Sequence, residues 1–132
     1  MGDADRREFI AAIAAAAVTS ALPGCATTRQ DERMYGLIGR MKVAPGQRGA
    51  VIQLLLDGTR AMPGCLSYVV AEDPTDPDAI WITEAWESKE SHQASLQLPA
   101  VQQAIASARP HITGFAEHFE TVPVGGVGLG LS

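Results

Sequence analysis

Residues 65–87 read CLSYVVAEDPTDPDAIWITEAWE. Two runs in this stretch, Cys65–Glu72 and Ala79–Glu87, are rich in β-branched, aromatic and other apolar residues, a composition typical of strands. The segment that separates them, 73–78, holds three aspartates and two prolines, which is typical of a turn. The pattern therefore predicts a β-hairpin. Because side chains alternate along a strand, one face of the second strand should carry Ile80, Ile82, Glu84 and Trp86.

The chain before this hairpin predicts a strand and a helix. Met34–Val43 alternates in the manner of a strand, and Ala44–Gly46, which includes a proline and a glycine, breaks it. Gln47–Met62 places apolar residues at helical spacing on one face and polar residues on the other. Pro63 and Gly64 are expected to end that helix.

The chain after the hairpin predicts two helices and a last strand. Ser88 is a typical N-cap residue for a short helix that runs to about Leu96, and Pro99 starts another helix. Gly114–Val124 is the last predicted strand. The order β-α-β-β-α-β with right-handed crossovers predicts an α+β fold, a ferredoxin-like antiparallel sheet with helices on one face.

The second face of such a sheet would be left uncovered. It would still carry apolar side chains such as Val69 or Trp81, depending on the strand. A small sheet with a bare apolar face usually finds a partner. We therefore expect a homodimer in which two sheets pack face to face into a barrel-like core.

Composition sets limits on the function. The chain has 132 residues, which is enough for one domain, and its formal net charge is −5. This charge argues against binding to a nucleic-acid backbone, which needs a basic face. Two cysteines are too few for a disulfide framework or a four-thiolate zinc site, and no metal-ligand set is visible. No apolar run has the strength of a stable membrane span.

Residues 1–25 resemble an export signal, with Arg6 and Arg7 before an alanine-rich run. The run ends in Leu-Pro-Gly-Cys, which resembles a lipobox whose cysteine, Cys25, becomes lipidated. We expect an exported protein, either periplasmic or anchored to a membrane by lipid; the alternative is an alanine-rich helix that stays on a cytoplasmic protein. Residues 26–33 would then be a tether and 124–132 a glycine-rich tail. Without lipidation, a disulfide between Cys25 and Cys65 remains open.

Three segments resemble the antibiotic biosynthesis monooxygenase family, which is a family of dimeric α+β barrels. They are GRMKVAPG at 39–46, PGCLSY at 63–68 and ITEAWES at 82–88, and the resemblance covers about residues 34–123. It implies a cofactor-independent monooxygenase that uses O2 to oxidise a small aromatic substrate, a quinol or phenol, to a quinone. The alternative is a non-catalytic module that binds a small aromatic ligand on the same fold. Haem degradation is a third reading.

Three residues are candidates for catalysis. Trp86 could stack on an aromatic ring and donate its N–H, or it could be a core tryptophan. Glu84 could take or orient a proton if it is buried, in which case its pKa should be raised. Its alternative role is a structural carboxylate paired with Arg40 or Arg109. His92 could be a base near neutral pH, or a solvent-facing helix residue.

Tyr68 and Ile82 are candidates for contact with the substrate, and both are expected on strands. Many family members have a histidine nine residues after the tryptophan, where this chain has Ser95. The polyketide-modifying members have an asparagine four residues before it, where this chain has Ile82. These departures favour the binding module and weigh against haem degradation. His111 and His118 are expected to be structural.

Overall fold

The computed structural model describes residues 33–129. The predicted export signal with Arg6, Arg7 and Cys25 lies outside the described residues, as do 26–32 of the tether and 130–132 of the tail. The described part forms four strands and three α-helices with a short 3-10 turn. In chain order they are β1 (Tyr35–Val43), α3 (Arg48–Gly58), β2 (Cys65–Glu72), β3 (Ala79–Trp86), α4 (Lys89–Ser95), α5 (Pro99–Ala108), η2 (Arg109–His111) and β4 (Ile112–Thr121).

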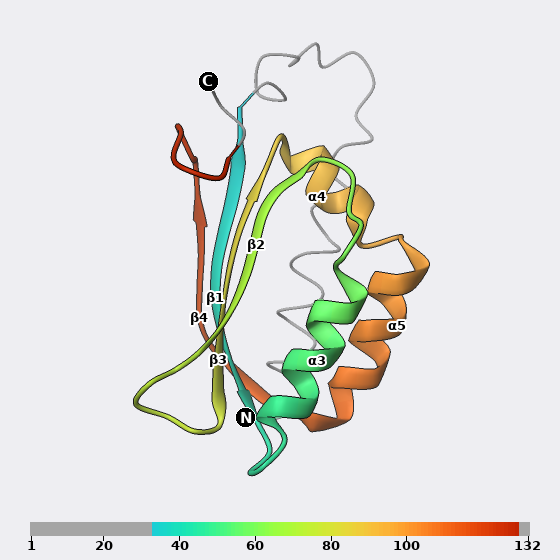
Figure 1. Cartoon of the computed structure of the whole chain (residues 1–132), viewed down its shortest axis with the longest axis vertical. Coiled ribbons are helices and arrows are strands. Elements are labelled where there is room, and N and C mark those ends of the chain that lie inside the picture. Colours follow the sequence, from blue (N-terminus) through green and yellow to red (C-terminus); the bar gives the residue numbers. More distant parts are fainter. Residues whose placement is uncertain (1–32, 130–132) are drawn as a thin grey trace.

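The strands form one antiparallel sheet in the order β2-β3-β1-β4. Helices α3 and α5 pack against each other on one side of this sheet, and α4 lies near the end at which β3 finishes (Figure 1). We call the side that faces the helices the inner face and the other side the outer face. The predicted α+β ferredoxin-like arrangement is confirmed.

Two elements, α3 and β4, differ from the prediction by more than one residue at a boundary. Helix α3 ends at Gly58 instead of Met62, where the Thr59 N–H and hydroxyl both bind the Leu55 carbonyl. A side chain at residue 58 would lie within 2.5 Å of the Ala104 Cβ on α5, so glycine lets the two helices approach closely. The last strand is shifted towards the N-terminus and spans Ile112–Thr121, before Pro123, which has no N–H for a ladder bond.

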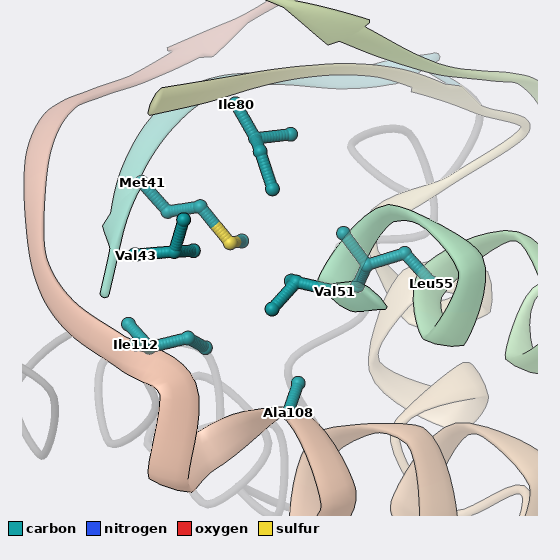
Figure 2. Close-up of a cluster of buried hydrophobic side chains, with 7 residues drawn as sticks. All are labelled: Met41, Val43, Val51, Leu55, Ile80, Ala108 and Ile112. Atoms are coloured by element: carbon teal, nitrogen blue, oxygen red, sulfur yellow. The ribbon is translucent and has the colours of Figure 1, made fainter. Parts of the chain in front are cut away.

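The hydrophobic core lies between the inner face and the helices. Ile80 and Val51 are 0% exposed, and both belong to a cluster of buried apolar side chains. Figure 2 shows how β1, β3 and β4 project side chains towards α3 and the end of α5. The cluster consists of Met41, Val43, Val51, Leu55, Ile80, Ala108 and Ile112.

A polar network fixes the hairpin turn to the outer face. The buried Asp73 carboxylate accepts hydrogen bonds from Arg40 Nε at 2.8 Å and from Trp81 Nε1 at 3.0 Å. It also accepts from the backbone N–H and the hydroxyl of Thr75. These donors hold the pKa of Asp73 well below its usual range, the Thr75 bonds contributing most. These hydrogen bonds connect the turn to Arg40 and Trp81 on the outer face.

The outer face has an apolar part beyond this network. Val69 is 51% exposed and Phe119 is 55% exposed. Strand pairing places Ile38 opposite Phe119 on one side and Thr83 on the other, and Thr83 opposite Val69, so these side chains form a row across the sheet. None of the helices within residues 33–129 is long and apolar enough to cross a bilayer.

Replacement of a core residue should destabilise the fold without touching the cavity described below. Ile80→Ala is expected to lower the free energy of unfolding by about 2 to 5 kcal/mol, because it removes apolar contacts and leaves a void. Urea unfolding followed by circular dichroism measures this change. Leu56→Ala is the control, since Leu56 is 44% exposed and its change should stay within about 0.5 kcal/mol. Equal effects of the two variants would contradict this account of the core.

Candidate functional site

A cavity of about 420 Å³ lies between the inner face of the sheet and the helices. Its walls are mostly apolar, and α3 and α5 supply side chains such as Leu55 and Val101. Four aromatic or ionisable groups that the sequence singled out also line it: Tyr68, Glu84, Trp86 and His92. An apolar enclosure with a few convergent polar groups is the usual form of a small-molecule site.

Glu84 carries the central polar group of the cavity. It lies within β3, opposite Leu37 on β1 and Tyr68 on β2, and its side chain is 16% exposed. Burial raises the pKa of Glu84 to about 7, against the hydrogen bond from Trp86, which lowers it. Near neutral pH the carboxyl group is therefore divided between its two forms, which suits proton exchange with a ligand.

Trp86 holds Glu84 in place. Its indole Nε1–H donates a 2.9 Å hydrogen bond to Glu84 Oε1. The two residues are two apart on one strand, so alternation puts them on the same face. Trp86 is only 1% exposed, and its N–H is directed to Glu84 instead of to a ligand. In this structure the Trp86 N–H is bonded to Glu84, and the ring lines the cavity.

His92 is buried, so the solvent-facing alternative is wrong. Its side chain is 5% exposed, and its Nε2 lies 3.9 Å from Glu84 Oε1. The ring contacts Trp86 edge-on, with centroids 5.4 Å apart. Burial lowers the pKa of His92 to about 4, and Lys89 adds to this effect. At neutral pH His92 is therefore an uncharged neighbour of Glu84.

The N-cap of α4 begins the helix that carries His92 to its place beside Glu84. Ser88 caps the helix by accepting a 3.1 Å hydrogen bond from the Ser91 N–H. Ser95, one turn after His92, is also buried and lines the cavity, but its hydroxyl donates to the His92 carbonyl at 2.6 Å. The Ser95 hydroxyl thus supports the helix.

The remaining predicted residues fall in two groups. Tyr68 and Ile82 both line the cavity, so the structure brings all five sequence candidates of the folded body together. Arg40 lies on the outer face and binds Asp73, so the alternative in which Arg40 pairs with Glu84 is wrong. His118, expected to be structural, also lines the cavity, and its strand pairing with Gly39 places it on the inner face. That placement follows from the register of β4, which sequence alone did not give.

The part of the chain that the structure describes contains no group of three or more His, Cys, Asp or Glu side chains that could hold a metal ion. Cys65 is a free thiol at the start of β2, and burial raises its pKa.

Comparison with known proteins places the fold in a family. The model of the family described as "Antibiotic biosynthesis monooxygenase" matches residues 34–107, which is over half of the chain. The chain belongs to this family. A solved structure from Chloroflexus aurantiacus J-10-fl, named as a candidate antibiotic biosynthesis monooxygenase, is 67% identical. The match covers 74% of this chain and 99% of the other, with a TM-score of 0.72.

More distant structures share the fold. A similarly named protein from Caulobacter crescentus CB15 is 20% identical, with a TM-score of 0.65 and coverage of 74% of this chain and 96% of the other. A Bacteroides thetaiotaomicron protein of unknown function, described as a possible oxidoreductase, is 19% identical, with a TM-score of 0.61 and coverage of 69% and 98%. No curated protein matches this chain. These more distant structures show the fold, and the family assignment comes from the model match over residues 34–107.

The raised pKa of Glu84 should make stability depend on pH. The folded state holds this proton more tightly than the unfolded state, whose pKa is 4.5. The stabilisation is complete below about pH 4.5 and is lost as pH rises through about 7. The glutamine in Glu84→Gln cannot ionise, so this loss of stability with rising pH should be absent. From about pH 5 to about pH 9, the wild type should therefore lose about 3 kcal/mol of unfolding free energy that the variant keeps.

Chemical denaturation at several pH values measures this difference. The contribution of His92 has the opposite sign and is lost as pH falls through about 6.5 towards 4, so the loss of stability with rising pH reports on Glu84. Glu87→Gln, at an exposed position just after β3, is the matched control and should follow the wild type. A parallel pH dependence in wild type and Glu84→Gln would show that Glu84 is not a buried acid.

Proposed function

We propose that this protein is a cofactor-independent monooxygenase that oxidises a quinol or a phenolic aromatic to a quinone with O2. The observation that carries the proposal is the Glu84 carboxyl group, which has a pKa of about 7 on the wall of a largely apolar cavity. Family membership supports the class of reaction, and the cavity supports an aromatic ring as the substrate.

The proposed reaction begins with a proton transfer. Ionised Glu84 takes the hydroxyl proton of the substrate, and the electron pair of the O–H bond stays on the substrate oxygen. The phenolate can then give one electron to O2, and the resulting radical pair couples to form a C–O bond. The peroxide anion takes the proton back from Glu84, and the hydroperoxide then breaks its O–O bond and loses its carbon-bound hydrogen, so that water leaves and a quinone carbonyl remains. One O2 is consumed and one water is released for each quinone formed.

Each candidate residue has a part in this scheme. Glu84 is the base, and Trp86 positions it through the 2.9 Å hydrogen bond. His92 stays neutral beside Glu84 at pH 7, so it does not lower the basicity of the carboxylate as a cation would. Ile82 gives the cavity wall an apolar surface for the ring, and Tyr68 contributes a hydroxyl group. The apolar walls exclude water from the phenolate.

Oxygen consumption by the purified protein tests the proposal. With no cofactor added, a panel of hydroquinones and polycyclic phenols should include a substrate whose oxygen uptake exceeds the autoxidation blank. Glu84→Gln should lower kcat/KM for that substrate by about 10² to 10⁴, the usual contribution of a general base. For the wild type, kcat/KM should rise with pH through about 7 as Glu84 ionises.

Glu87→Gln is the control and should keep wild-type activity. Oxygen uptake that Glu84→Gln leaves unchanged would remove Glu84 from the mechanism. If no compound in the panel is oxidised but one of them raises the melting temperature, the protein is instead a module that binds a small aromatic ligand. A Soret shift on addition of haem would support haem binding in place of both the oxygenase and the aromatic-ligand module.

We also propose that a second copy of the chain covers the outer face and forms a homodimer. The exposed Val69 and Phe119 support this, because apolar side chains in a row across a sheet favour sheet-to-sheet packing. Sedimentation velocity should therefore report a dimer. Phe119→Glu should shift it to a monomer, whereas Leu56→Glu, on the exposed side of α3, should leave it intact. A monomeric wild type at micromolar concentration would refute the dimer.

A further inference from the structure

Tyr68 lies next to Glu84 across the sheet. The two residues are direct partners in the pairing of β2 with β3, so their side chains leave the sheet on the same face. Directly opposite residues of antiparallel strands have Cβ atoms about 5 Å apart. Both side chains line the cavity. A phenol hydroxyl and a carboxyl group thus share one wall of the site.

The Tyr68 hydroxyl has no hydrogen-bond partner among the described residues, although the side chain is mostly buried. In the same part of the chain, every fully enclosed side-chain nitrogen or oxygen atom has a partner. The hydroxyl is therefore not fully enclosed by the described residues, and the cavity is the space that the Tyr68 side chain lines. Since polar groups inside proteins are normally hydrogen-bonded, this hydroxyl is suited to bind a polar atom of a ligand.

Tyr68 and Glu84 offer opposite hydrogen-bonding roles, one as a donor and the other as an acceptor. Burial and the nearby Glu84 charge hold the pKa of Tyr68 well above its usual range, so Tyr68 keeps its proton and can donate. Glu84 Oε1 already accepts the Trp86 N–H, which leaves Oε2 as the acceptor for a ligand. A donor and an acceptor side by side match an atom that accepts and donates at once. A hydroxyl oxygen is such an atom, whereas a ketone or ether oxygen can only accept.

We propose that Tyr68 is a catalytic residue that donates a hydrogen bond to the substrate hydroxyl oxygen while Glu84 takes the proton of that hydroxyl, and that this pair selects hydroxylated aromatics. The role rests on the proposed function, in which Glu84 is the base. The substrate O–H bond breaks, its proton goes to Glu84 Oε2, and its electron pair stays on oxygen. The hydrogen bond from Tyr68 strengthens as this negative charge develops, so it favours the anion over the neutral phenol.

Binding of 4-nitrophenol tests Tyr68 without any turnover, because its phenolate is yellow and its phenol is colourless. Wild-type protein should bind it and hold part of it as phenolate. Tyr68→Phe should weaken binding about ten-fold or more and lower the phenolate fraction, since a charge-assisted hydrogen bond is lost. Nitrobenzene, which lacks the hydroxyl, should bind both proteins equally.

Tyr35→Phe is the matched control. Tyr35 is the only other tyrosine of the chain, and its hydroxyl donates to Glu120 outside this cavity. This variant should bind 4-nitrophenol as the wild type does. If Tyr68→Phe does not fold, the Tyr35→Phe protein can be produced with 3-fluorotyrosine, which then replaces Tyr68 alone and is a stronger donor. The phenolate fraction should then rise.

Three results would overturn the proposal: no binding of 4-nitrophenol by the wild type, unchanged affinity and colour in Tyr68→Phe, or an unchanged colour with 3-fluorotyrosine. The proposed oxygenase function fails separately. Tyr68-dependent phenolate formation without any oxygen uptake would support the hydroxyl-selecting pair and refute the oxygenase. Oxygen uptake that depends on Glu84 and is equal in Tyr68→Phe and wild type would support the oxygenase and refute the role of Tyr68.

Discussion

The Glu84 carboxyl group stands on the inner face of a strand that has neighbours on both sides, and its burial constrains the residues around it. A carboxylate removed from water costs free energy unless hydrogen bonds replace those of water. One such bond comes from Trp86, which the alternation of the strand places on the same face. His92 adds no charge, because its own burial keeps it neutral. With one hydrogen bond from Trp86 and no charge on His92 to offset its burial, the Glu84 carboxyl group has a pKa of about 7.

Much of the fold follows from local patterns in the sequence. Two strand-like runs around a turn rich in aspartate and proline predict the hairpin of β2 and β3. In the structure, Asp73 of that turn accepts hydrogen bonds from Arg40 and Trp81. The period of two along β3 correctly puts Glu84 and Trp86 on the face that meets the helices. Ser88 caps α4 as its side chain and position predict. The hairpin, the two faces of β3 and the cap of α4 depend on residues close in sequence, whereas Arg40 contacts Asp73 from another strand.

The details that sequence did not give depend on distant contacts. The burial of His92 is set by the way α4 rests on the end of the sheet, and a helix of seven residues is too short for its pattern to indicate which side is covered. The end of α3 depends on close contact between Gly58 and Ala104 on α5. His118 reaches the cavity because of the register of β4, which is interrupted by irregular pairing with β1. Strand alternation alone does not carry a prediction across such irregularities.

The two ionisable neighbours in the cavity divide the acid–base roles between them. Burial opposes charge on both groups, so it raises the pKa of Glu84 and lowers that of His92. At pH 7 a proton therefore resides on Glu84 before it resides on His92, the reverse of their order in water. This order is consistent with the proposed function, in which Glu84 exchanges the proton and His92 stays uncharged in the cavity wall. Because Glu84 is the base in the proposed function, proton transfer there does not require a histidine at position 95, where this chain has Ser95.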